Sequence, residues 1–219
     1  NNTMTHTLHT EIFGQGTSVT LLHGWGMNSQ VWPKAVLLQL PVKWTLVDLP
    51  GHGKSSHIPL SSDINVVLKQ LNEIIPKDTI LIGWSLGGMF ALALAQQKAR
   101  GRRLGLISSS PQFIQSKNWQ YATSVKTLAT FSESLQKNAR LTIKRFIALQ
   151  FMNVPDAKAQ IITIQKRILN NHTLDTASLQ TGLHYLQTLN LRAHCASLNQ
   201  PVIGFYGKLD NLVPYRAIK

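Results

Sequence analysis

The segment ILIGWSLGG (residues 80–88) contains the pattern G-x-S-x-G between a short apolar run and a helix-forming run. A serine exposed at the tip of a strand needs a very tight turn before the helix that follows. A side chain at Gly83 or Gly87 would collide there with neighbouring backbone, which explains both glycines. The N-terminal N–H groups of the following helix favour negative charge that develops at Ser85. The segment therefore predicts a strand, a nucleophilic serine and a helix, in that order.

Apolar runs alternate with helical patterns on both sides of this segment. This alternation favours a mostly parallel central sheet with helices on both faces, an α/β fold. From about residue 111 to residue 191 the chain has only helical patterns, which predicts a helical insertion. Strands are expected at 17–22, 43–49, 79–83, 104–109 and 201–206, and helices at 29–40, 63–75 and 86–97.

The composition limits the class of protein. Of the 219 residues 43% are hydrophobic, enough for a packed core, so a disordered or collagen-like chain is excluded. The one cysteine, Cys195, cannot form an intrachain disulfide, which favours a reducing compartment. No apolar run reaches the roughly 18 residues of a membrane span, and the polar start has no signal-peptide core. We expect a cytoplasmic monomer without a membrane partner.

The chain is strongly basic, with 22 Lys and Arg against 9 Asp and Glu, a net charge of +13. Such a charge suits an acidic protein, nucleic acid or an anionic surface, or it has no ligand meaning. A nucleic-acid role is disfavoured because no basic-aromatic motif or recognition helix is visible. We expect no nucleic-acid partner.

Three further motifs follow predicted strands. LLHGWG (residues 21–26) comes after the first strong strand, and DLPGHGKS (residues 48–55) after the next. The third, GKLDNLVP (residues 207–214), follows the last strand, and its Asp210 is the only acid in the last 40 or so residues. A turn aspartate that caps a local N–H is the alternative role for Asp210.

Together these motifs resemble the α/β-hydrolase superfamily, and within it most closely the pimeloyl-[acyl-carrier protein] methyl ester esterase family of biotin synthesis. The similarity runs over nearly the whole chain. The stretches that carry it are LLHGWGMN (21–28), VDLPGHGKS (47–55), IGWSLGG (82–88), SSSPQF (108–113), RFIALQ (145–150) and YGKLDNLVP (206–214).

The resemblance implies a role for each motif. Ser85 is the nucleophile and Asp210 the acid that orients a histidine base, while the N–H groups of Trp25 and Leu86 form the oxyanion hole. We interpret His23 as a brace of its loop rather than a base, and the Asp48–Ser55 turn, with His52, as structural. The substrate site would be lined by Trp25, Ser85, Leu86, Phe146, Ile147, Ala148, Leu149 and Gln150.

The resemblance also implies a four-helix cap over the site and a chain divided into a core (1–110), a cap (111–192) and a second, incomplete part of the core (193–219). The stretch from residue 111 to residue 192 contains ten basic and three acidic residues, which gives a net charge of +7. An acidic acyl carrier protein would be attracted to such a surface, unless it is simply a solvated helical face. Arg145 and Lys158 match basic cap positions of the family and are the expected carrier contacts.

One departure concerns the base. All eight histidines of the sequence precede Asp210, and none has the expected loop context; His184 and His194 are poor candidates. We expect the last strand, the histidine loop and the last helix to be missing from this stretch, which makes it a truncated esterase. An inactive product, or a binding protein that kept the pocket, are the alternatives.

The expected function is therefore a serine carboxylesterase that hydrolyses the methyl ester of pimeloyl-[acyl-carrier protein], with side activity on short esters. No metal or organic cofactor is expected, because Ser-His-Asp chemistry needs none. A thioesterase or a carbon–carbon bond hydrolase would keep the same serine and stays open.

Overall fold

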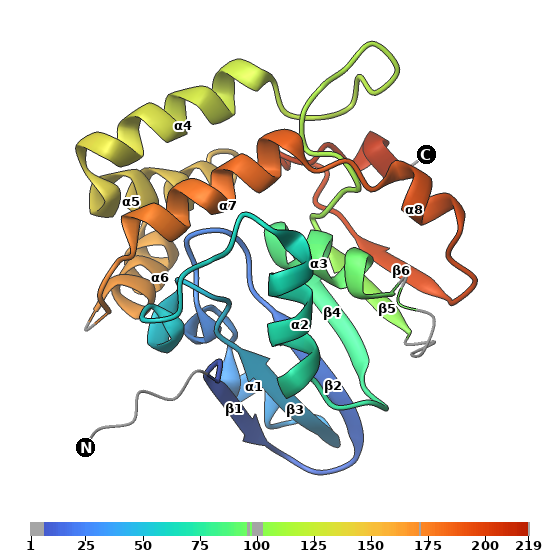
Figure 1. The fold of residues 1–219 in the computed structure, drawn as a ribbon. Helices are drawn as coiled ribbons and strands as arrows, with labels where there is room; N and C mark the ends of the chain where they lie inside the picture. Colours follow the sequence, from blue (N-terminus) through green and yellow to red (C-terminus); the bar gives the residue numbers. More distant parts are fainter. Residues whose placement is uncertain (1–6, 96, 98–102, 171, 219) are drawn as a thin grey trace.

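The computed structural model describes residues 7–95, 97, 103–170 and 172–218. A six-stranded sheet lies at its centre, in the order β1-β3-β2-β4-β5-β6 (Figure 1). Only β1 runs antiparallel, against β3, and the other neighbours are parallel. The strands are β1 (Thr10–Phe13), β2 (Thr17–Leu22), β3 (Val42–Val47), β4 (Ile80–Trp84), β5 (Leu104–Ile107) and β6 (Val202–Phe205). The predicted mostly parallel α/β fold is confirmed.

Neighbouring residues of each strand point to opposite faces of the sheet. Leu22, Val47 and Leu81 belong to the larger core, which also contains α2 (Ile64–Ile74) and α3 (Leu86–Ala95). Leu21 and Leu46 belong to a second cluster on the other face, closed by Leu37 of α1 (Lys34–Leu37). Every residue of α3 is buried, because the helix packs against the sheet on one side and α2, α7 (Thr176–Thr188) and α8 (Arg192–Ala196) on others.

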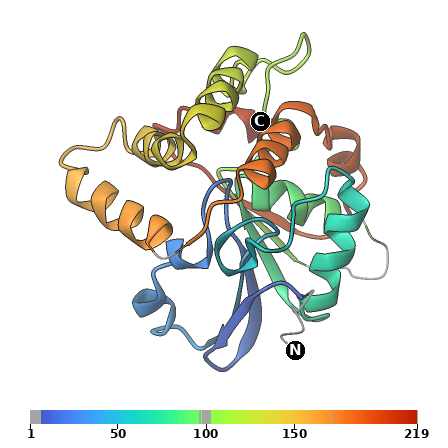
Figure 2. The same ribbon diagram turned by 60° about the vertical axis from the view of Figure 1, so that its left-hand side comes forward.

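Four longer helices lie between β5 and β6 in the chain. They are α4 (Val125–Lys137), α5 (Ala139–Gln150), α6 (Lys158–Leu169) and α7. Both ribbon views show them gathered beyond one end of the sheet (Figures 1 and 2). Side chains cap three of their N-termini: Ser124 accepts from the Thr127 N–H, Asn138 from Leu141 and Asp175 from Ser178, as residues of these types commonly do.

The predicted helix at 29–40 is wrong in extent. The chain forms a 3-10 turn, η1 (Ser29–Val31), and then the short α1. Pro33 separates the two, because proline lacks an N–H and disfavours helical backbone in the residue before it. The strand β1 was not expected, since four residues at the edge of a sheet give little periodicity. The other predicted strands and helices lie within two residues of the observed bounds.

Candidate active site

Ser85 lies on a strained bend between β4 and α3. Its φ is +54°, in the left-handed region that non-glycine residues seldom occupy. The Ser85 carbonyl accepts from the N–H groups of Gly88 (2.9 Å) and Met89 (3.2 Å), so the helix begins at once. The Ser85 N–H donates to the Ile107 carbonyl at 3.1 Å, which ties the bend to the end of β5. The predicted strand–serine–helix turn is confirmed.

The glycines around Ser85 leave no room for a side chain. A Cβ atom at Gly83 would lie 2.4 Å from the Gly87 oxygen, and one at Gly87 would lie 2.4 Å from the His23 oxygen. The predicted collisions are therefore confirmed. A Cβ at Gly24 would lie 3.1 Å from the Cβ of Ser85, so the loop after β2 touches the serine.

Trp25 fixes this loop beneath the inserted helices. The residue is fully buried, and its indole N–H donates to the Leu179 carbonyl of α7 at 2.8 Å. The Trp25 ring meets Phe146 of α5 edge to face, with centroids 4.9 Å apart. Among the residues that the structure describes, no backbone carbonyl outside the helices and strands accepts from the N–H of Trp25 or Leu86.

His23 has both ring nitrogens engaged. Nδ1 lies 2.8 Å from the Gly24 carbonyl, and Nε2 accepts from the Leu49 N–H at 3.0 Å. A carbonyl only accepts, so the proton resides on Nδ1 and the ring is neutral. Burial, with a smaller contribution from nearby His52, lowers the pKa of His23 to about 3. This geometry supports a bracing role for His23 and leaves no nitrogen free to act as a base.

The DLPGHGKS turn is held in the same manner. His52 lies within hydrogen-bond distance of the Pro50 carbonyl through Nδ1 and accepts from the Gly26 N–H through Nε2 at 3.1 Å. The Asp48 carboxylate accepts from the N–H groups of Ser29 (2.6 Å) and Lys54 (2.9 Å). Burial lowers the pKa of His52. The turn thus buttresses the loop at Trp25, as a structural element would.

Asp210 follows β6, and its Oδ1 accepts from the N–H groups of Leu212 (2.8 Å) and Val213 (3.0 Å). These bonds are the local cap that the sequence left open as an alternative, and they also fix the direction of the carboxylate. Asp210 lines a cavity of about 470 Å³ together with Ser108 and with Gln150 of α5. The structure thus brings the predicted acid and one predicted substrate residue to the same cavity.

A chain of hydrogen bonds links the ends of β4, β5 and β6. The Tyr206 hydroxyl donates to the Ser109 carbonyl at 2.7 Å, and the Ser109 hydroxyl donates to the Ser85 carbonyl at 2.8 Å. Sequence reasoning missed both residues as supports of the serine. The quoted SSSPQF stretch contained Ser109, but nothing in its pattern told which serine would reach Ser85.

The predicted substrate residues of α5 divide by burial. Phe146 and Ile147 are buried, whereas Ala148, Leu149 and Gln150 are half-buried. Phe146 also meets Phe131 of α4 edge to face, at 5.4 Å between centroids. Leu86, the first residue of α3, is fully buried. Trp25, Phe146 and Phe131 therefore form a continuous aromatic row from the loop at Ser85 into the helices.

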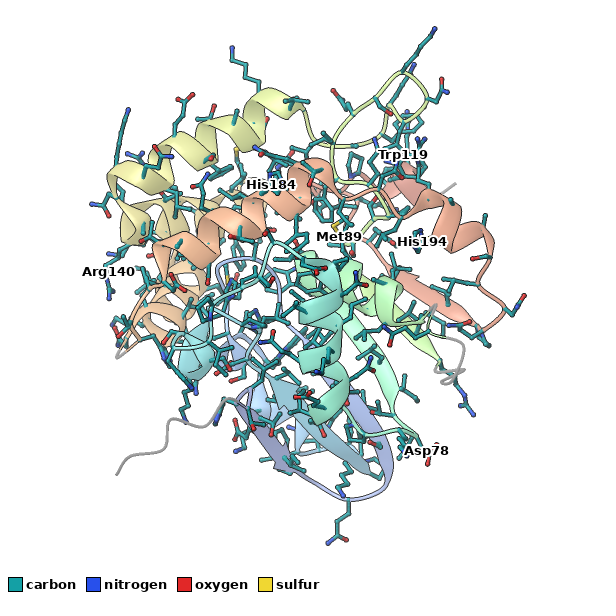
Figure 3. All side chains as sticks on the ribbon, viewed as in Figure 1. Asp78, Met89, Trp119, Arg140, His184 and His194 are labelled. Atoms are coloured by element: carbon teal, nitrogen blue, oxygen red, sulfur yellow. The ribbon has the colours of Figure 1, made fainter. Side chains whose placement is uncertain are left out.

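The remaining predicted positions lie at the surface. Arg145 and Lys158 are exposed, on α5 and at the start of α6. His184 is exposed on α7 and His194 lies on α8 (Figure 3). His6 lies outside the described residues. Within the described ranges no three His, Cys, Asp or Glu side chains gather as a metal site, and no helix is both long and apolar enough to cross a membrane.

Comparisons with known proteins identify the family of the chain. A family model described as alpha/beta hydrolase fold matches residues 17–219. The pimeloyl-[acyl-carrier protein] methyl ester esterase of Vibrio vulnificus is 37% identical over 215 residues, covering 97% of this chain and 84% of that protein. The protein of the same name from Pseudoalteromonas atlantica is 38% identical over 213 residues, covering 96% and 82%.

Solved structures show the same fold at low sequence identity. An esterase from Exiguobacterium antarcticum superposes with a TM-score of 0.83 at 20% identity, covering 96% of this chain and 81% of that one. An enol-lactonase from Burkholderia xenovorans gives a TM-score of 0.77 at 15% identity, covering 96% and 81%. With the strained serine, the matched family model and the identity to the named esterases, the chain belongs to the alpha/beta hydrolase family.

Proposed function

We propose that the protein is a serine carboxylesterase that hydrolyses the methyl ester of pimeloyl-[acyl-carrier protein] in biotin synthesis. The observation that carries the proposal is Ser85 on its left-handed bend beside the loop at Gly24. The names of the relatives supply the substrate. Neither a metal nor an organic cofactor takes part in the proposed chemistry.

The proposed reaction is a two-step acyl transfer. Ser85 Oγ attacks the ester carbonyl while a histidine, oriented by Asp210, takes its proton. The oxyanion is held by the N–H groups of Trp25 and Leu86. Methanol leaves with the proton from the histidine, water attacks the acyl-enzyme, and a free carboxylate and Ser85 result. His23 and His52 each have both ring nitrogens engaged, so neither of them is the proposed base.

The proposed substrate contacts are the positions that match the resembled family. Phe146, Ile147 and Leu149 would hold the acyl chain, with Ala148 and Gln150 beside it, and Trp25 would close the pocket next to Ser85. Apolar burial is mostly non-specific, so side activity on short-chain esters is expected. Arg145 and Lys158 are exposed cations that would contact the acidic carrier.

We also propose the division of the chain into a core (1–110 and 193–219) and a cap (111–192). The support is that α4 to α7 separate β5 from β6, that Trp25 meets Phe146 of α5, and that Asp210 lines one cavity with Gln150 of α5. We propose further that the protein acts in the cytoplasm, in keeping with its single cysteine, and that it is a monomer.

The test uses protein from the complete reading frame. Ser85→Ala should lower turnover of a short p-nitrophenyl ester and of the carrier-bound methyl ester by roughly 10⁴-fold or more. It should also abolish labelling by a fluorophosphonate probe. Ser134→Ala, on α4, is the matched control and should behave as the unchanged protein. Undiminished turnover in Ser85→Ala would reject the assignment, and preference for a thioester over the methyl ester would point to a thioesterase.

A further inference from the structure

A second cavity lies on the side of the molecule where α6 meets the core. Its volume is about 670 Å³, which is within the usual range for small-molecule sites. Residues of the core line one side, and residues 166, 167, 170, 172 and 173 line the other. Helix α6 packs near this place against η1 (Figure 2). The residues that matter for its chemistry are Lys54, Ser56, Lys166, Arg167, Asn170 and His172.

Among the described residues that line the cavity, three are cations and none is a carboxylate. Lys54, Lys166 and Arg167 all line it, and His172 adds a third type of nitrogen donor. The one salt bridge found within the described ranges joins Lys34 to Glu11, so these three cations have no carboxylate within salt-bridge distance there. All three side chains are exposed, so water and salt weaken the repulsion between them, but their combined positive charge still attracts an anion to this cavity.

The nearby acids are already engaged. Asp48 accepts from the backbone N–H groups of Ser29 and Lys54. Asp175 accepts from the N–H and the hydroxyl of Ser178 at the start of α7. Neither carboxylate lines the cavity. The positive charge of the lining is therefore available to an external ligand.

The helix end explains only part of this cluster. Cations in the last turn of a helix are stabilised by its dipole, and Lys166 and Arg167 lie in the last turn of α6. The last carbonyls of α6 are nevertheless bonded elsewhere, since Asn28 donates to Ile168 and Arg140 to Leu169. Lys54 comes from a different segment, η2 (Gly53–Ser55), and still lines the same space.

From this arrangement we propose that the cavity between η2 and the end of α6 binds a small molecule through its phosphate group. A guanidinium with two ammonium groups and side-chain hydroxyl and amide donors suits the several oxygens and double charge of a phosphate. A single carboxylate would use fewer of these donors. The site is separate from Ser85 and does not depend on the proposed esterase activity.

The test is isothermal titration calorimetry of the full chain with three probes at equal ionic strength: inorganic phosphate, glycerol 3-phosphate and acetate. We expect one phosphate site per chain and binding of acetate at least about tenfold weaker. Tighter binding of glycerol 3-phosphate than of inorganic phosphate would indicate that the ligand is an organic phosphate. Equal binding of the two would indicate that the ligand is free phosphate. Acetate binding equal to phosphate, or no phosphate binding, would overturn the proposal.

Two double variants separate the cavity from the overall charge. Lys166→Gln with Arg167→Gln should weaken phosphate binding by about tenfold or more. The control, Lys126→Gln with Lys137→Gln on α4, removes the same charge, and Lys137 also lies in the last turn of its helix. It should leave binding within about twofold. An equal loss of phosphate affinity in the two double variants would show that phosphate is attracted by the net charge of the whole chain and not bound at this cavity. Lys54→Gln, which leaves α6 intact, should also weaken binding.

Discussion

The bend that presents Ser85 and the helices α4 to α7 above it are stabilised in different ways. At the bend, backbone packs directly on backbone, and the Cβ positions of Gly83 and Gly87 are already filled by carbonyl oxygens. In the helices, side chains make the contacts, through Trp25, Phe146 and Phe131. The comparison indicates that Ser85, the proposed nucleophile, is positioned by rigid backbone, whereas the shape of the proposed acyl pocket depends on replaceable side chains.

The largest expected effect is at the bend. Gly87→Ala places a Cβ 2.4 Å from one backbone oxygen and 2.5 Å from another, and backbone cannot give way as a side chain can. We expect a loss of about 4–5 kcal/mol in unfolding free energy, at the extreme of single substitutions. Urea denaturation followed by circular dichroism measures it. Gly207→Ala is the control, because its Cβ would have no neighbour closer than 3.8 Å. Similar stability of the two variants would show that backbone packing at Gly87 does not hold the bend.

The next effect is in the aromatic row. Phe146→Ala removes a buried ring between Trp25 and Phe131 and should cost about 3 kcal/mol. It should raise KM for long acyl esters more than it lowers kcat. Leu141→Ala on the same helix, 41% exposed, should cost well under 1 kcal/mol. A fall in kcat with an unchanged KM would contradict the proposal that the Phe146 side chain binds the acyl chain.

Acid should loosen the turn that supports the bend. The folded-state pKa of His23 is about 3, below its value in the unfolded chain, so the unfolded state binds the proton first as pH falls. The contribution of His23 to the unfolding free energy is fully present above about pH 6.5. It should fall by up to about 1.4 kcal/mol per pH unit between pH 6.5 and 3. His52, with its lowered pKa, adds to this loss. Asp48, whose pKa is also lowered overall despite burial, adds a further loss only at lower pH.

Denaturation midpoints between pH 7 and 4 measure this effect. His23→Gln should be less stable at pH 7 and should show a shallower dependence on pH. His184→Gln removes an exposed histidine of α7 and should keep the original slope. A slope unchanged by His23→Gln would show that the buried histidine is not responsible.

The smallest effect is expected at the surface of the cap. Arg145→Gln with Lys158→Gln should raise KM for the carrier-bound ester several-fold at low salt, because charge steers association. Turnover of a small p-nitrophenyl ester should not change. The difference should shrink in high salt as charges are screened. An equal effect on both substrates would place these residues in the active site itself.

The difference between backbone packing at Ser85 and side-chain packing in α4 to α7 also explains which features the sequence could predict. Gly83, Ser85 and Gly87 were interpretable because a collision between backbone atoms tolerates only glycine. The sheet followed from strands with regular apolar patterns, whereas Pro33 interrupted a helix that periodicity alone had extended to residue 40. The contacts of Trp25 with Leu179 and Phe146, and of Ser109 with Ser85, join residues far apart in the chain. Many side-chain combinations could fill those spaces, so no local pattern specifies them.

The most direct measurement is a crystal structure of the complete protein after reaction with a fluorophosphonate. We predict that phosphorus is bonded to Ser85 Oγ and that the phosphonyl oxygen lies about 3 Å from both the Trp25 and the Leu86 nitrogen atoms. Phosphorus on another residue, or an oxygen directed away from those two amides, would contradict the account.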